Sequence, residues 1–240
     1  MKVAIPIFPS RITQILIIAV IGLTLTGLAA ALSTGMHIEN YWLREAHESF
    51  VRLFHLAGEA NISAWYSSST LLFCAALLAV IAVAKRINSD DYVLHWAVLS
   101  LIFLYLSVDE AAVLHEMAIK PMRAMLNPSG LFYYAWIIPA LIAVLIFVVA
   151  YLRFLTHLPM KTRLLFIASG ALFVSGAIGL ESVSGLFAGS DGTRSLTWEL
   201  ITILEELFEM LGVVLFIYTL LDYISSNLAP VAFAAGDCQS

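Results

Sequence analysis

Four glutamates lie close together in an apolar stretch near the C-terminus, where they could bind cations. The stretch reads WELITILEELFEMLG and includes Glu199, Glu205, Glu206 and Glu209. On a helix that turns by about 100° per residue, all four fall within about a third of the circumference. Ionised carboxylates are costly to bury in an apolar environment. We therefore expect partners for them elsewhere in the chain.

Two other apolar stretches supply further groups of this kind. One ends in FLYLSVDEAAVLHEMA, in which Asp109 and Glu116 share a helical face to within about 20°. Glu110 and His115 lie on either side of that face, and a third apolar stretch contributes Glu181. Together the three stretches could form one acidic site.

Carboxylates in such a site can be neutralised by protons, by basic side chains or by metal ions. Because carboxylates with one or two imidazoles suit Fe, Mn or Zn, we predict a divalent metal site. The predicted ligands are Asp109, His115, Glu116, Glu181, Glu206 and Glu209. The predicted supporting residues are Glu110, Glu199, Glu205, Arg52, His55 and Glu59. The predicted spans lack the Glu-x-x-His pairs of di-iron bundles, so the pattern does not specify a di-iron centre.

A metal site of this kind would suit a membrane metalloenzyme, either a hydrolase or an oxidoreductase, that acts on a lipid or another small apolar substrate. Two alternatives use the same acids. In a proton- or cation-coupled transporter they would form a relay, and in an accessory subunit they would pair with basic residues of a partner. The sequence contains no G-x-S-x-G, Walker, Rossmann, H-E-x-x-H or C-x-x-C motif, so it indicates no catalytic residue.

The composition indicates the class of protein that must position these acids. The chain of 240 residues is 61% hydrophobic and 12% charged, with a net charge of −5. This excludes an ordinary soluble domain and predicts an all-α, polytopic membrane protein surrounded by lipid. No nucleic-acid partner is expected, and the oligomeric state is not specified by the sequence. The two cysteines form neither a disulfide framework nor a zinc motif.

Six apolar stretches are long enough to span a bilayer, and they account for residues 1–240 as a single transmembrane domain. The first is interpreted as an uncleaved helix, because its apolar run is long for a signal peptide. Pro139 predicts a kink in the fourth, and residues 226–240 are predicted to be a flexible tail. The predicted spans are 12–32, 64–84, 92–117, 131–154, 162–186 and 195–224.

Basic residues near the span ends favour an arrangement with both termini inside. The inner side then carries seven basic residues, Lys2, Arg11, Lys85, Arg86, Arg153, Lys161 and Arg163. The outer side carries five, Arg44, Arg52, Lys120, Arg123 and Arg194. In this topology all the acids described above lie in the outer leaflet. We expect a bacterial inner-membrane protein whose site faces the outer side.

The connection before the second span predicts an amphipathic outer helix over residues 39–60. Glu48, Arg52, His55 and Glu59 recur there at intervals of four, three and four residues, which places them on one stripe. The stripe could be the solvated face of an interfacial helix, or it could cap the acidic site.

Two further patterns concern packing. Ala171, Ser175 and Gly179 form a small-residue face, with Gly176 and Gly185 nearby, that predicts a helix–helix contact. Tryptophans near the predicted outer ends indicate an aromatic belt at the membrane interface. They are Trp42, Trp65, Trp136 and Trp198.

Overall fold

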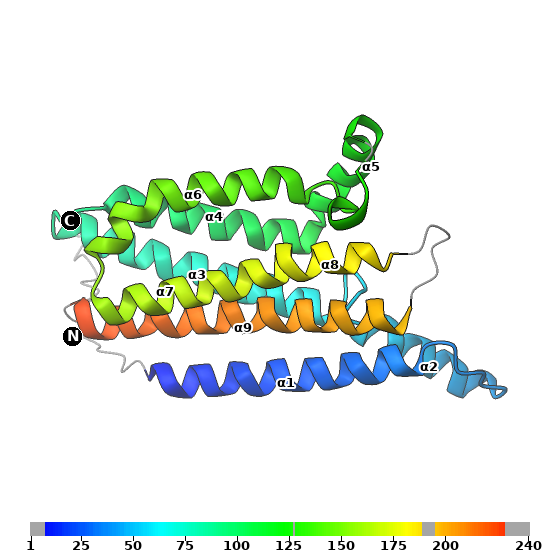
Figure 1. The fold of residues 1–240 in the computed structure, drawn as a ribbon. Coiled ribbons are helices and arrows are strands. Elements are labelled where there is room, and N and C mark those ends of the chain that lie inside the picture. Colours follow the sequence, from blue (N-terminus) through cyan, green and yellow to red (C-terminus); the bar gives the residue numbers. More distant parts are fainter. Residues whose placement is uncertain (1–7, 127, 189–194, 229–240) are drawn as a thin grey trace, which may run out of the picture.

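The protein is a bundle of long helices that run side by side (Figure 1). The computed structural model describes residues 8–126, 128–188 and 195–228, and within these the chain forms helices and no β-strand. Five helical segments are long and apolar enough to cross a membrane. These are α1 (Pro9–Ser33), α3 (Ile62–Ile87), α4 (Val93–Ala112), α6 (Ile137–His157) and the run Met160–Leu186. They are consistent with an integral, multi-pass membrane protein.

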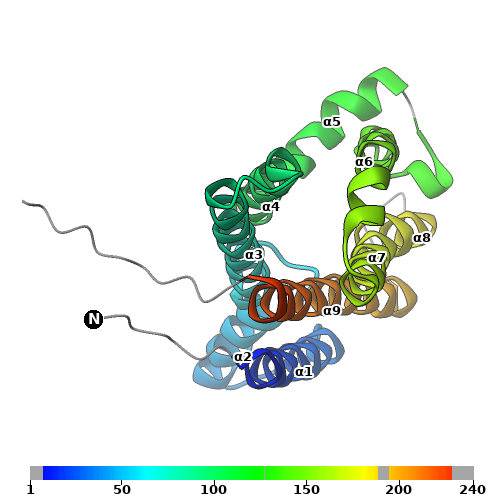
Figure 2. The ribbon, with the colours of Figure 1, turned by 90° about the vertical axis from the view of Figure 1, so that its left-hand side faces the viewer.

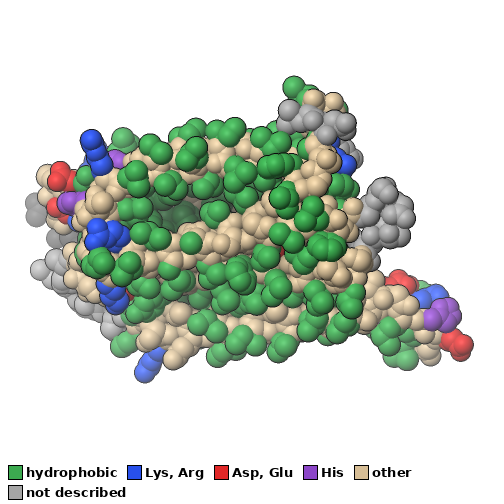
Figure 3. All heavy atoms as spheres, viewed as in Figure 1, with side chains coloured by type: hydrophobic (Ala, Val, Ile, Leu, Met, Phe, Trp, Pro, Cys, Tyr) green, Lys and Arg blue, Asp and Glu red, His purple; other side chains and the backbone are tan. Residues whose placement is uncertain are grey.

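A further long helix, α9 (Leu196–Asn227), carries the four glutamates of the C-terminal stretch. It packs against α1, α3 and α7 (Met160–Val174), and it lies between them when the bundle is viewed along its axis (Figure 2). Most residues of its C-terminal half are buried. The beginning of α1 and the end of α9 lie at the same end of the bundle (Figure 1). Basic side chains gather at that end (Figure 3).

The third predicted span, 92–117, was too long. Helix α4 ends at Ala112, and Val113 adopts a left-handed conformation with φ 55°. The carboxylate of Asp109 accepts a hydrogen bond of 2.9 Å from the backbone N–H of His115, which stabilises the break. The chain then continues as α5 (Leu114–Leu126), which projects beyond the end of the bundle (Figure 1).

The fourth predicted span, 131–154, begins later in the structure than predicted. Residues Gly130–Phe132 form a short 3₁₀ helix, η1, and α6 begins only at Ile137. Pro139 therefore lies in the first turn of α6, where its missing N–H removes no helical hydrogen bond. The predicted kink at Pro139 was wrong for this reason.

The predicted outer helix 39–60 is shorter in the structure. Helix α2 (Tyr41–Phe54) has no buried residue and lies at the end of the bundle (Figure 1). It ends where a loop begins that is held by Asn61, whose amide donates to the carbonyl oxygens of His55 and Gly58 at 2.8 and 2.6 Å. The Asn61 side chain also caps α3 by accepting from the N–H of Ala64. His55 and Glu59 consequently leave the predicted stripe.

Aromatic rings fill the end of the bundle where α1 begins. Trp96 of α4 packs edge to face on Phe154 of α6, with ring centroids 5.0 Å apart. Phe166 of α7 contacts both rings, and Tyr223 of α9 lies against Trp96. Interlocking rings of this size leave little room for solvent. This end of the bundle is therefore closed by side chains from four helices.

Helix α6 is packed at its two ends and loosely between them. Ile137 near its beginning and Tyr151 and Phe154 near its end are buried. No residue between Ile138 and Ala150 is buried. The surface is hollowed between α6 and α7 (Figure 3). The side of α6 that faces the bundle, which we call its inner stripe, thus borders a partly open, apolar space.

The fifth segment contains a π-helix and contacts α9 closely at a glycine. Helix α7 continues into the π-helical turn η2 (Ser175–Leu180) and then into α8 (Glu181–Leu186). Of the predicted small residues, Gly176 makes the contact with α9, and its face also carries the buried Phe166 and Ser169 at helical spacing. Ala171, Ser175 and Gly179 are exposed. A methyl group on Gly176 would lie 2.8 Å from the carbonyl oxygen of Glu205 and from Cγ of Glu209.

Replacing Gly176 with alanine should push α9 away from η2. We expect Gly176→Ala to lower the free energy of unfolding by about 1–3 kcal/mol, because the added methyl group meets backbone that cannot yield easily. Gly179→Ala is the matched control, since a methyl group there meets nothing within 4 Å. Thermal unfolding of both variants in the same detergent measures the difference. Equal destabilisation of the two variants would contradict this close approach.

Candidate functional site

Six glutamates from four segments of the chain come within electrostatic reach of one another. Glu206 of α9 interacts with Glu110 of α4, with Glu59 of the loop before α3 and with Glu181 of α8. Glu209 interacts with Glu206, Glu110 and Glu181. Glu205 interacts electrostatically with Glu181 and Glu206. We call this set the carboxylate cluster: Glu59, Glu110, Glu181, Glu205, Glu206 and Glu209.

Glu205, Glu206 and Glu209 interact with no base among the described residues, whereas Glu110 interacts with His115. No ion pair or hydrogen bond to the side chains of Glu110, Glu205, Glu206 or Glu209 occurs within this part of the chain. All four residues are half-buried, whereas Glu59 is exposed at the rim. Several negative charges so close together in apolar surroundings repel one another strongly. The described side chains do not supply the charge that would balance Glu205, Glu206 and Glu209, which leaves protons and bound cations as candidates.

Thr202 lies on the same face of α9 as the carboxylate cluster, one turn from Glu206. It is only 8% exposed, and its hydroxyl oxygen has no hydrogen-bond partner among the described residues. Threonines in the middle of a helix commonly donate to the carbonyl of their own preceding turn, as Thr24 and Thr219 do here. Thr202 makes no such bond. Its hydroxyl is thus a buried polar group that remains available beside the glutamates.

Asp109 and His115 pair with each other. The carboxylate Oδ2 of Asp109 lies 2.9 Å from Nδ1 of His115, while Oδ1 accepts from the His115 backbone. Asp109 is therefore engaged in the break between α4 and α5, and its neighbour Glu110 interacts with Glu206 instead. Glu116 belongs to α5, but its side chain lies outside the described part of the structure.

Tryptophans predicted for the interface belt connect the site to its surroundings. The indole N–H of Trp136 donates to Oε1 of Glu181 at 2.9 Å, and its ring packs on that of His115. The indole N–H of Trp198 donates to the hydroxyl of Tyr134 at 3.3 Å. Trp136 is half-buried and Trp198 is buried, so neither belongs to an exposed belt. Trp42 and Trp65 are exposed, as such a belt requires.

The loop after α2 closes over one side of the site. Nε2 of His55 lies 3.1 Å from Oε2 of Glu199, and both side chains are about nine-tenths buried. Glu199 therefore differs from the other glutamates of α9, since it has an imidazole partner. Arg52 is exposed on α2, and Glu48 pairs with Arg44 across the solvent-exposed side of that helix. The predicted cap thus consists of the loop around His55 rather than a continuous helical stripe.

The carboxylates lie near one another without converging on a point. No group of three or more His, Cys, Asp or Glu side chains in the described residues is close enough to hold one metal ion. The structure brings Glu181, Glu206 and Glu209 of the predicted ligands together with Glu110, Glu205 and Glu59 of the predicted supporting residues. The arrangement of the described side chains therefore gives no support to the predicted metal site.

The His55–Glu199 pair should be worth far more than an exposed ion pair. A double-mutant cycle with His55→Gln and Glu199→Gln is expected to give a coupling of about 1–3 kcal/mol, because both groups are desolvated. The same cycle on Arg44 and Glu48, whose side chains are 50% and 65% exposed, should give less than about 0.5 kcal/mol. Chemical unfolding in detergent measures both couplings. A His55–Glu199 coupling as small as that of the exposed pair would show that the loop does not close this site.

Comparison with known proteins gives a family but no characterised relative. No curated protein and no solved structure matches the chain. A family described as a domain of unknown function (DUF8692) matches residues 16–224. The match extends from the first turns of α1 to the last turns of α9 and includes the whole carboxylate cluster. The chain therefore belongs to the DUF8692 family.

Proposed function

We propose that the chain forms one transmembrane unit of six spans with both termini inside, in a bacterial inner membrane. The five apolar segments account for five crossings. With 32 residues, α9 is about 48 Å long and runs the length of the bundle, which suits a sixth. The basic residues at the end where α1 begins favour that end as the inner one. The carboxylate cluster then lies toward the outer side.

Within this topology we infer that the protein is a proton-linked membrane carrier whose protons bind at the carboxylate cluster. The observation that carries this proposal is the gathering of four half-buried glutamates from α4 and α9, three of which, Glu205, Glu206 and Glu209, interact with no base among the described residues. Intramembrane carboxylates of this kind are typical of proton relays and coupled transporters. The described residues contain no group of three or more His, Cys, Asp or Glu that could hold one metal ion, which favours protons as the neutralising charge in this proposal.

The surrounding helices support a role in transport. The inner end of the bundle is closed by Trp96, Phe154 and neighbouring rings, so the cluster is reached from the other side. The π-helical turn η2 lies directly against Glu205 and Glu209. π-helical turns are frequent at functional sites, where they add a locally adjustable segment to a helix. In the proposed carrier, η2 would be the adjustable segment next to the glutamates that bind protons.

A divalent metal is the second candidate, and the Asp109–His115 pair favours it. A carboxylate bonded to Nδ1 of an imidazole is a common device for orienting a histidine toward a metal. In that case Fe, Mn or Zn would be held by His115 with nearby glutamates. The protein would then be a membrane metalloenzyme that acts on a lipid or another apolar substrate.

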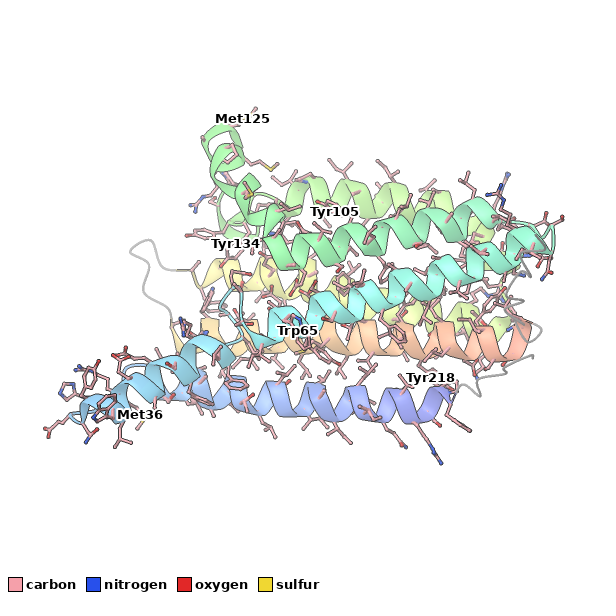
Figure 4. All side chains as sticks on the ribbon, turned by 180° about the vertical axis from the view of Figure 1, so that it is seen from behind. Met36, Trp65, Tyr105, Met125, Tyr134 and Tyr218 are labelled. Carbon is pink, nitrogen blue, oxygen red and sulfur yellow. The ribbon has the colours of Figure 1, made fainter. Side chains whose placement is uncertain are left out.

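The topology can be tested by labelling single cysteines in a variant that lacks Cys74 and Cys238. Met125 at the tip of α5 (Figure 4) is 84% exposed, and Met125→Cys should react with an impermeant maleimide added outside intact cells. Met160→Cys and Ser226→Cys should react only after the cells are opened, because both residues are exposed at the opposite end. Reaction of Ser226→Cys in intact cells would mean that α9 does not cross the membrane.

The protonation of the carboxylate cluster can be measured by infrared spectroscopy. We expect a carboxylic-acid C=O band in the wild type that loses intensity in Glu206→Gln and again in Glu206→Gln/Glu209→Gln. Glutamine is a neutral isostere, so these variants should remain folded. Glu48→Gln is the control, since that glutamate is exposed on α2 and should leave the band unchanged.

The same samples distinguish the two candidates when their metal content is determined. Absence of bound metal together with the carboxylic-acid band supports the proton-linked carrier. Stoichiometric Fe, Mn or Zn that is lost in Glu206→Gln/Glu209→Gln, with no carboxylic-acid band in the wild type, would overturn it in favour of the metal site.

A further inference from the structure

We propose that the carboxylate cluster binds an amphipathic organic cation, with its ammonium at Thr202, Glu206 and Glu209 and its apolar part along the inner stripe of α6. This inference rests on the proposed function and names the substrate class of that site. The carrier would exchange the bound protons for this cation. The ligand is a lipophilic amine that carries one positive charge and no anionic group.

The polar half of the site consists of groups that suit an ammonium. Glu206 and Glu209 supply negative charge, and the buried hydroxyl of Thr202 supplies an acceptor that has no other partner among the described residues. All three lie on one face of α9 within about a quarter of a turn of each other. An ammonium has several N–H donors that point in different directions. It can therefore use acceptors that do not converge as metal ligands must, and no group of three His, Cys, Asp or Glu in the described residues could hold one ion.

Aromatic rings lie directly inward of these acceptors. Phe216 follows Glu209 by two helical turns on the same face of α9, and it stacks on Phe103 of α4 with ring centroids 4.7 Å apart. Phe103 is half-buried, so part of its ring remains accessible. Aromatic faces attract cations and also pack against alkyl chains. The rings of Phe216 and Phe103 therefore suit the part of the ligand that joins the ammonium to the apolar group.

The apolar half of the site lies along α6. Ala140, Val144 and Phe147 recur at helical spacing on the side of α6 that leads to the buried Tyr151, yet all three are only half-buried. The surface between α6 and α7 is hollowed (Figure 3). An alkyl or aryl group in this hollow would complete the packing of α6. Because the hollow opens sideways between two apolar helices, such a group could enter directly from the lipid.

The charge of the site decides against a phospholipid as the occupant. An aminophospholipid offers an ammonium, but its phosphate would lie in apolar surroundings beside the glutamate that has given up its proton, and the two negative charges would repel each other. A lipophilic amine has no such penalty. Binding of one cation to a protonated glutamate releases one proton to the water, so the charge of the site is unchanged by the exchange.

Binding of radiolabelled dodecylamine to the protein in phosphatidylcholine nanodiscs tests the proposal, with empty nanodiscs as the background. We expect saturable binding, about one proton released per amine bound, and no competition by dodecanol. Thr202→Val keeps the shape of the side chain and should weaken binding by about tenfold, because it removes an acceptor for a charged donor. Thr202→Ser should restore binding, and Glu48→Gln should not change it.

The outcomes separate this inference from the proposed function. A carboxylic-acid band without saturable dodecylamine binding would overturn the inference and leave the proton-linked carrier standing. Absence of both the carboxylic-acid band and saturable dodecylamine binding would overturn the proposed function and this inference together. Equal binding by wild type and Thr202→Val would show that the amine does not use this face of α9. Preferential binding of phosphatidylethanolamine over dodecylamine would replace the proposed ligand with a phospholipid.

Discussion

The structure depends on how negative charge is accommodated inside an apolar bundle. An unpaired carboxylate in such surroundings costs several kcal/mol, and neighbours of the same sign increase that cost. One glutamate of α9, Glu199, is paired with His55. The other three, Glu205, Glu206 and Glu209, lie near Glu110 and Glu181 and interact with no base among the described residues. Protons or bound cations are therefore the candidates for balancing their charge.

Close packing between α9 and the fifth segment determines where these carboxylates lie. Gly176 allows the π-helical turn to touch the backbone of Glu205, and Gly212 allows α9 to touch the backbone of Phe173. Any side chain at either position would separate the two helices and move Glu181 away from Glu205. The small residues therefore serve the acidic site indirectly, by bringing two acid-bearing helices into register.

The sequence predicted the long helices and the gathering of acids from separate helices. It did not predict where individual helices break. Apolar length and helical periodicity depend on many residues and survive local exceptions. The ends of α4 and α2, in contrast, depend on single side chains, Asp109 and Asn61, which bond to nearby backbone. No periodic pattern marks such bonds. Once α4 ended at Ala112, the expected shared face of Asp109 and Glu116 was lost, and Glu110 became the residue that interacts with α9.

A hydrogen bond connects the site to α6, the most loosely packed of the long helices near it. At one end α6 is held by the aromatic rings around Phe154, and at the other by the hydrogen bond from Trp136 to Glu181. A carboxylate is a stronger acceptor than a carboxylic acid, so in the proposed carrier the bond from Trp136 would weaken when Glu181 takes up a proton. No residue in the middle of α6 is buried, so few contacts would resist a movement there. The proposed carrier would in this way link the charge state of the carboxylate cluster to the width of the hollow beside α6.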